Sequence, residues 1–78
     1  KQVELALQKQ MELKEWMDKE GLERDGYNSE EIGECLYSLN RKDEAKPYFM
    51  NAYEKLSKDI WLAENEKERL QRLKELGE

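Results

Sequence analysis

The sequence has no histidine, one cysteine, one proline and four glycines among its 78 residues. Without imidazole, the Ser-His and Cys-His pairs of nucleophilic catalysis cannot form, and neither can the Glu-x-x-His pairs of di-iron bundles. Ser29, Ser38 and Ser57 therefore have no candidate base. We expect no enzymatic activity, no catalytic residue, no metal site and no cofactor.

A single cysteine cannot form an intramolecular disulfide. Cys35 has the apolar neighbours Ile32 and Leu36 on one helical turn, and this pattern predicts a buried thiol that behaves as a small core residue. Reduced thiols are typical of intracellular proteins, so we expect a cytoplasmic protein.

Long apolar runs and a basic excess are also lacking. No stretch approaches the roughly 18 apolar residues of a membrane span, and the first residues lack the apolar region of a signal peptide. Lys and Arg number 14 against 19 Asp and Glu, which gives a formal charge of −5. Because nucleic acids and anionic membranes require a basic surface, we expect no nucleic-acid partner and no membrane partner.

The residues that are abundant favour helices. Glu, Lys, Leu, Arg and Ala are strong helix formers, and few glycines or prolines interrupt them, so the sequence predicts an all-α fold in one domain, residues 1–78. Apolar periodicity and turn residues predict four helices. These cover residues 2–20, a second segment capped by Asn28 or Ser29 and running to Leu39, a third from Asp43 to Leu56, and residues 65–77 with a capping box from Asn65 to Glu68. The turn after Leu39 contains Asn40, which suits a left-handed backbone conformation.

The first of these helices has an unusually wide apolar surface. At about 100° per residue, its apolar side chains cover more than half of the circumference. Such a helix needs partners on two sides, either within the domain or from another chain. The residues concerned are Val3, Leu5, Ala6, Leu7, Met11, Leu13, Trp16 and Met17.

The two middle helices carry a spaced pattern of small and large residues. Ser29-x2-Ile32-Gly33-x2-Leu36 is followed by Ala45-x3-Phe49 and then Ala52. Small residues allow two antiparallel helices to approach closely, while Phe49 fills the neighbouring space. This pattern resembles one 34-residue tetratricopeptide repeat over about residues 26–59. The sequence departs from the family pattern at Ser29, Leu36 and Ser57, where the family has a large aromatic residue, Tyr and Pro.

The resemblance implies an antiparallel helical hairpin, flanked here by residues 1–20 and capped by residues 65–77, in the manner of an α-α superhelix. It also implies a non-enzymatic protein-interaction module whose first hairpin helix lines a peptide groove. The groove residues would be Tyr27, Glu30, Glu34 and Tyr37, with Ser38 beside them.

The chemistry of these groove residues suggests a type of partner. Glu30 and Glu34 occupy the places where related modules hold Lys and Asn to clamp a carboxylate, so an acidic tail would be repelled. A protein or peptide with Lys or Arg, anchored on Tyr27 and Tyr37, fits the predicted groove better. The alternative is that the two glutamates form a solvated helix face and the tyrosines belong partly to the core.

No second copy of the repeat is found when the frame is shifted by 34 residues, although repeat arrays usually need about three units to bury a continuous core. Three arrangements remain open: the flanking helices complete the core, the chain forms a homo-oligomer, or it is part of a longer array. The alternative function is therefore a structural or oligomerisation element, in which the apolar faces of the flanking helices matter and the groove is idle.

Overall fold

The computed structural model describes residues 2–22 and 25–78, and these residues form five helices without a strand. The helices are α1 (Gln2–Lys19), α2 (Gly26–Ser38), α3 (Lys42–Leu56), α4 (Ile60–Asn65) and α5 (Lys67–Gly77). The all-α class predicted from composition is confirmed.

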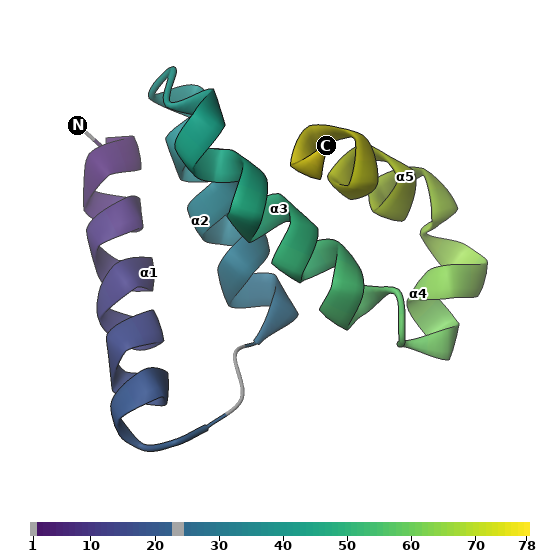
Figure 1. The fold of residues 1–78 in the computed structure, drawn as a ribbon, viewed down its shortest axis with the longest axis horizontal. Coiled ribbons are helices and arrows are strands. Elements are labelled where there is room, and N and C mark those ends of the chain that lie inside the picture. Colours follow the sequence, from purple (N-terminus) through teal and green to yellow (C-terminus); the bar gives the residue numbers. More distant parts are fainter. Residues whose placement is uncertain (1, 23–24) are drawn as a thin grey trace.

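An antiparallel hairpin of α2 and α3 forms the centre of the molecule (Figure 1). The turn between them passes through Asn40, whose φ of 62° is left-handed. That conformation was expected, because Asn accepts a positive φ more readily than most residues and frees the chain to reverse. The six hairpin residues selected from the sequence lie in or against this interface. Ile32, Leu36, Ala45, Phe49 and Ala52 are buried members of the core, and Gly33 is buried beside them.

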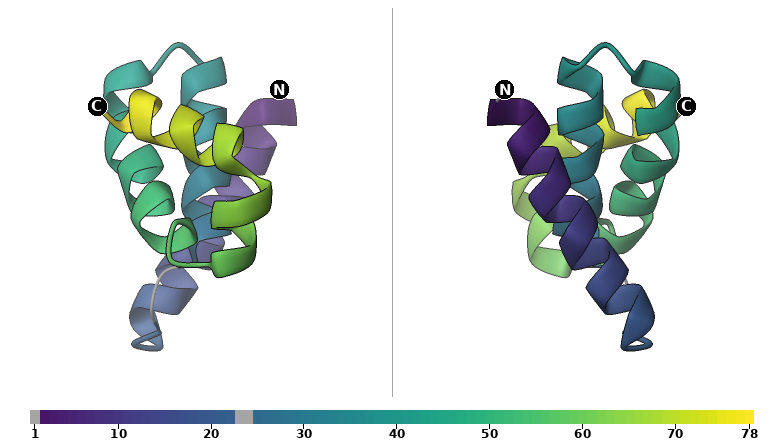
Figure 2. Two further views of the ribbon diagram at one scale, coloured as in Figure 1. Left: turned by 90° about the vertical axis from the view of Figure 1, so that its right-hand side faces the viewer. Right: turned by 90° about the vertical axis from the view of Figure 1, so that its left-hand side faces the viewer.

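The remaining helices cover the two sides of the hairpin. Figure 2 shows α1 against one side, running alongside α2, and α5 crossing the hairpin on the other side. The short α4 continues from α3 and turns the chain into α5 (Figure 1). Leu62, Leu70 and Leu73 join the hairpin core from this side. On α1 the one buried side chain is Met17, which lies outside this core, and Leu7 and Met11 are partly buried against it. The two flanking helices are thus unequally embedded, α5 deeply and α1 lightly.

The predicted start of the second helix was wrong because a nearby aspartate provides the cap. Asp25 accepts a hydrogen bond from the backbone N–H of Tyr27 at 2.9 Å, so α2 begins at Gly26. Asn28 and Ser29, the predicted caps, are buried within α2 and bond to neighbouring helices instead. An aspartate at this position satisfies an otherwise unpaired N–H at the helix start.

The predicted capping box at Asn65 was also wrong. Asp59 accepts hydrogen bonds from the backbone N–H groups of Trp61 and Leu62, which starts an additional helix, α4, between the third and last predicted helices. Asn65 is the last residue of α4, and its side chain donates to the carbonyl of Trp61 at 2.9 Å. The last helix begins at Lys67 and has no side-chain cap.

Candidate interaction surface

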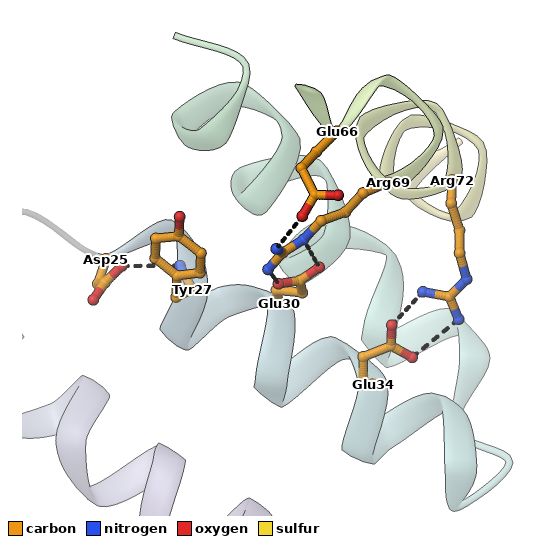
Figure 3. Close-up of polar contacts among 7 residues, drawn as sticks. All are labelled: Asp25, Tyr27, Glu30, Glu34, Glu66, Arg69 and Arg72. Carbon is orange, nitrogen blue, oxygen red and sulfur yellow. Dashed lines mark hydrogen bonds and ion pairs between the residues drawn. The ribbon is translucent and has the colours of Figure 1, made fainter. Parts of the chain in front are cut away.

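The four predicted groove residues all lie on α2, and their side chains range from buried to half-exposed. Glu30 is only 9% exposed, whereas Tyr27 is 46% exposed and Tyr37 is 37% exposed. Figure 3 shows that both glutamates point toward α5 rather than toward open solvent. The structure therefore brings the acidic residues of the predicted groove against another part of the same chain.

Glu30 is paired with Arg69 of α5. The Nε of Arg69 donates to one carboxylate oxygen at 3.0 Å, and a terminal nitrogen donates to the other (Figure 3). The same guanidinium lies 5.3 Å from the ring centroid of Tyr27 and 3.7 Å from a carboxylate oxygen of Glu66. The hydrogen bond to Glu30 raises the pKa of Arg69. A fork-to-fork contact of this kind fixes orientation as well as charge.

Glu34 is paired in the same way with Arg72, one turn further along both helices. The two terminal nitrogens of Arg72 donate to the two carboxylate oxygens, one of them at 3.1 Å. This hydrogen bonding raises the pKa of Arg72. Both side chains are more exposed than those of the Glu30–Arg69 pair, so water screens the contact more strongly.

Tyr37 also has partners within the chain. The Nζ of Lys42 lies 5.1 Å from its ring centroid, and the ring packs edge-on against Phe49 with centroids 6.3 Å apart. All four predicted groove residues therefore already contact a cation of this chain. The chemistry expected for a basic partner is present, but Arg69, Arg72 and Lys42 occupy it. A basic peptide would have to replace those contacts.

A different surface, on α1, has no such cover among the described residues. Leu5 is 58% exposed, Leu13 is 41% exposed and Trp16 is 53% exposed. The other apolar side of this helix, with Leu7 and Met11, packs against the core. The helix thus uses one of its two predicted apolar faces in the fold and leaves the second in solvent.

Two hollows adjoin this exposed face. An open groove of about 230 Å³ lies between α1 and α2 and is lined by Gln2, Val3, Ala6, Glu34, Cys35 and Ser38. A shallow depression of about 250 Å³ lies on α1 itself and is lined by Gln2, Leu5, Ala6 and Lys9. Both hollows have mostly apolar walls, so together with Leu13 and Trp16 they make a surface suited to another apolar element.

The thiol of Cys35, in the wall of this groove, has low nucleophilic reactivity. Cys35 is a free, buried cysteine. Burial, followed by the negative charges of Glu31 and Glu34, raises the pKa of its thiol. Because the thiolate is the nucleophilic form, this environment disfavours covalent chemistry at Cys35.

Across residues 2–22 and 25–78, the structure holds no group of three or more His, Cys, Asp or Glu side chains arranged to bind a metal ion. Within those same ranges, none of the helices has the length and apolarity needed to cross a membrane.

Comparison with known proteins gives no relative: no family model, no curated protein and no solved structure matches this chain.

The sequence pattern missed two features of the surface. Arg69 and Arg72 were not linked to Glu30 and Glu34, because the paired residues lie on different helices, 39 and 38 positions apart. The depression at Leu5 depends on which side of α1 faces the hairpin, which the sequence left open.

Proposed function

We propose that this chain is a non-enzymatic protein-interaction module that binds a helical segment of a partner along the exposed face of α1. The single observation that carries the proposal is the exposure of Leu5, Leu13 and Trp16 on a helix whose other apolar side packs against the core. Large apolar side chains gathered on one face of a small protein are typical of an interaction site. A partner helix would rest on these residues, with apolar side chains every three or four positions.

The groove between α1 and α2 forms part of this surface. Cys35 and Ser38 of α2 supply one wall, and Val3 and Ala6 of α1 supply the other. The proposal thus keeps a groove lined by the first hairpin helix, as the resemblance to a tetratricopeptide unit implies, but places the partner on the α1 side of that helix. Cys35 is a buried, free thiol with a raised pKa. Free reduced thiols are typical of the cytoplasm, so this residue supports a cytoplasmic location.

The face with Glu30 and Glu34 is the second candidate. Its support is the ability of this face to receive arginines, as Arg69 and Arg72 demonstrate within the chain. Leu70 and Leu73, next to those arginines, are buried in the core. A basic peptide that removed α5 would therefore expose apolar surface, at about 25 cal/mol per Å². This cost favours the α1 face.

Titration with synthetic amphipathic helical peptides, followed by NMR, tests the proposal. The peptides should share an apolar stripe and differ in flanking charge, and the protein should be kept dilute. We expect shifts of the Trp16 indole and of amides around Leu5, Leu13 and Ser38. Leu13→Glu should weaken binding by about tenfold or more, as hot-spot residues do.

Ile60→Glu is the matched control, because Ile60 is 74% exposed and lies on α4. It should leave peptide binding unchanged. If only basic peptides cause shifts, and these are confined to Tyr27, Tyr37 and the Arg69 side chain, the binding site is the α2 face and not α1. No shifts with any peptide would overturn it.

A further inference from the structure

We infer that the helix which binds the exposed face of α1 is α1 of a second copy of this chain, packed antiparallel about a twofold axis. This inference rests on the proposed function and names its partner. It follows from the shape of the depression on α1 and from the arrangement of charge around it.

The depression has the form that a helix pair requires. Its lining residues, Gln2, Leu5, Ala6 and Lys9, are spaced i, i+3, i+4 and i+7, the four-residue pattern that receives one side chain of a facing helix in knobs-into-holes packing. Trp16 is the large exposed side chain on the same face, 53% exposed. It lies too far along α1 to fill the depression of its own helix.

An antiparallel second copy solves this mismatch. If the twofold axis passes beside the point between Gln10 and Met11, Trp16 of each copy faces Leu5 of the other. Each indole then enters the depression of the opposite copy. The two insertions are equivalent, as a twofold interface demands.

The same register pairs opposite charges. Lys9 and Glu12 are centred on the same point of α1, so Lys9 of one copy faces Glu12 of the other, twice per dimer. Leu5, Lys9, Glu12 and Trp16 fall within about 60° of the helix circumference, so one contact surface includes all four. Within residues 2–22 and 25–78, neither the Lys9 nor the Glu12 side chain forms a hydrogen bond or ion pair, which leaves both side chains for a facing copy.

The interface is one helix pair. α1 has 18 residues, about 27 Å at 1.5 Å per residue, and such a contact lies at the small end of specific interfaces. We therefore expect a reversible dimer whose population depends on concentration.

The single-tryptophan variant Trp61→Phe allows the fluorescence of Trp16 to be followed alone.

Analytical ultracentrifugation and tryptophan emission over a wide concentration range provide the test. We expect the mass to rise from 9.4 kDa toward twice that value, and the Trp16 emission of the Trp61→Phe variant to shift to the blue as the indole is buried. Leu5→Glu should keep the chain monomeric. Ile60→Glu, on the exposed part of α4, should dimerise as the wild type does.

Charge reversal tests the register itself. Lys9→Glu and Glu12→Lys each place like charges opposite one another twice, and each should weaken the dimer by about tenfold at low salt. An equimolar mixture of the two variants should restore association, since both cross-pairs are then attractive. Circular dichroism checks that each variant remains helical.

The outcomes separate this inference from the proposed function. A chain that stays monomeric at every concentration yet binds helical peptides at Trp16 would overturn the dimer and leave the interaction module standing. A dimer that ignores Leu5→Glu, or a charge-reversed mixture that fails to recover, would overturn the antiparallel α1 contact.

Discussion

Arg69 reaches from the last helix to Glu30 near the start of the hairpin and binds its carboxylate through two nitrogens, across 39 positions of sequence. The carboxylate is almost fully buried there, with 11% of its side chain exposed. A buried carboxylate without a partner is costly, so Arg69 compensates a charge that the fold itself has enclosed. The contact joins α5 to α2, two helices that are not neighbours in the chain.

Removing the arginine should expose that dependence. Arg69→Ala leaves Glu30 buried without a cation and removes the guanidinium from Tyr27, so we expect a loss of about 2–3 kcal/mol in the free energy of unfolding. Arg72→Ala is the matched control, because its pair with Glu34 is half-exposed and should contribute less than about 1 kcal/mol. Urea denaturation followed by circular dichroism measures both. Equal losses for the two variants would contradict the role assigned to burial.

Gly33 should not tolerate a methyl group. A Cβ at this position would lie 3.0 Å from two ring carbons of Phe49, which is itself 1% exposed and cannot easily move. Overpacking costs about 1–3 kcal/mol, while alanine gains about 1 kcal/mol over glycine in helix propensity. We expect Gly33→Ala to lower the free energy of unfolding by about 1 kcal/mol in thermal or urea denaturation. In a Phe49→Leu background the penalty should shrink, and an undiminished penalty there would show that Phe49 is not its cause.

Asn28 should hold α1 in place. Its Nδ2 donates to the backbone carbonyl of Gln10 at 3.0 Å and to the side-chain oxygen of Gln10 at 2.8 Å. Asn28→Ala removes both bonds, at about 1–2 kcal/mol, and we expect faster amide hydrogen exchange throughout α1 with little change in α3. Ser29→Ala is the comparison, since the Ser29 hydroxyl donates to Asn51 of α3 at 2.6 Å. That variant should increase exchange at the α2–α3 contact. The assignment fails if Asn28→Ala leaves α1 as protected as in the wild type.

Cys35 gives a pH dependence of known sign. Its pKa is raised by burial and by Glu31 and Glu34, so the folded chain should hold less thiolate than the unfolded chain above about pH 8.5, the ordinary thiol value. The rate at which iodoacetamide alkylates the folded chain should therefore still increase at pH values where the rate in urea has already levelled off. By linkage, the contribution of the Cys35 thiol to the free energy of unfolding is fully present below the pKa of the unfolded thiol. It is lost as pH rises toward the higher pKa of the folded thiol. Cys35→Ala should lack this loss, and identical alkylation profiles with and without urea would contradict the shift.

The sequence predicted what depends on local periodicity. The helical class, the turn at Asn40 and the glycine at position 33 that faces Phe49 all follow from patterns within a few turns of chain. Helix starts were less predictable. Asn65 and Glu68 have the spacing of a capping box, but Asn65 is the last residue of α4, which Asp59 caps, and α5 begins at Lys67 without a side-chain cap. Leu62 of the additional helix is buried in the core, and such long-range packing is not contained in a local pattern.

The candidate surface was half predictable for the same reason. The two apolar sides of α1 were visible in its sequence, whereas the choice of which side docks on the hairpin depends on long-range packing of Leu7 and Met11. Glu30 and Glu34 were expected to face a partner or solvent. Their actual partners lie 38 and 39 positions away, beyond the reach of periodicity.

The contact between Arg69 and Glu30 also has a consequence for the rates of folding. The α2–α3 hairpin closes through neighbouring segments, whereas α5 must span half of the chain to reach α2, and contacts of large sequence separation are slow to form because of the entropy of loop closure. A bond made after the folding barrier changes the unfolding rate more than the folding rate. The arginine of the last helix therefore acts mainly on the lifetime of the native state, and its loss should shorten that lifetime while the speed of folding stays nearly the same.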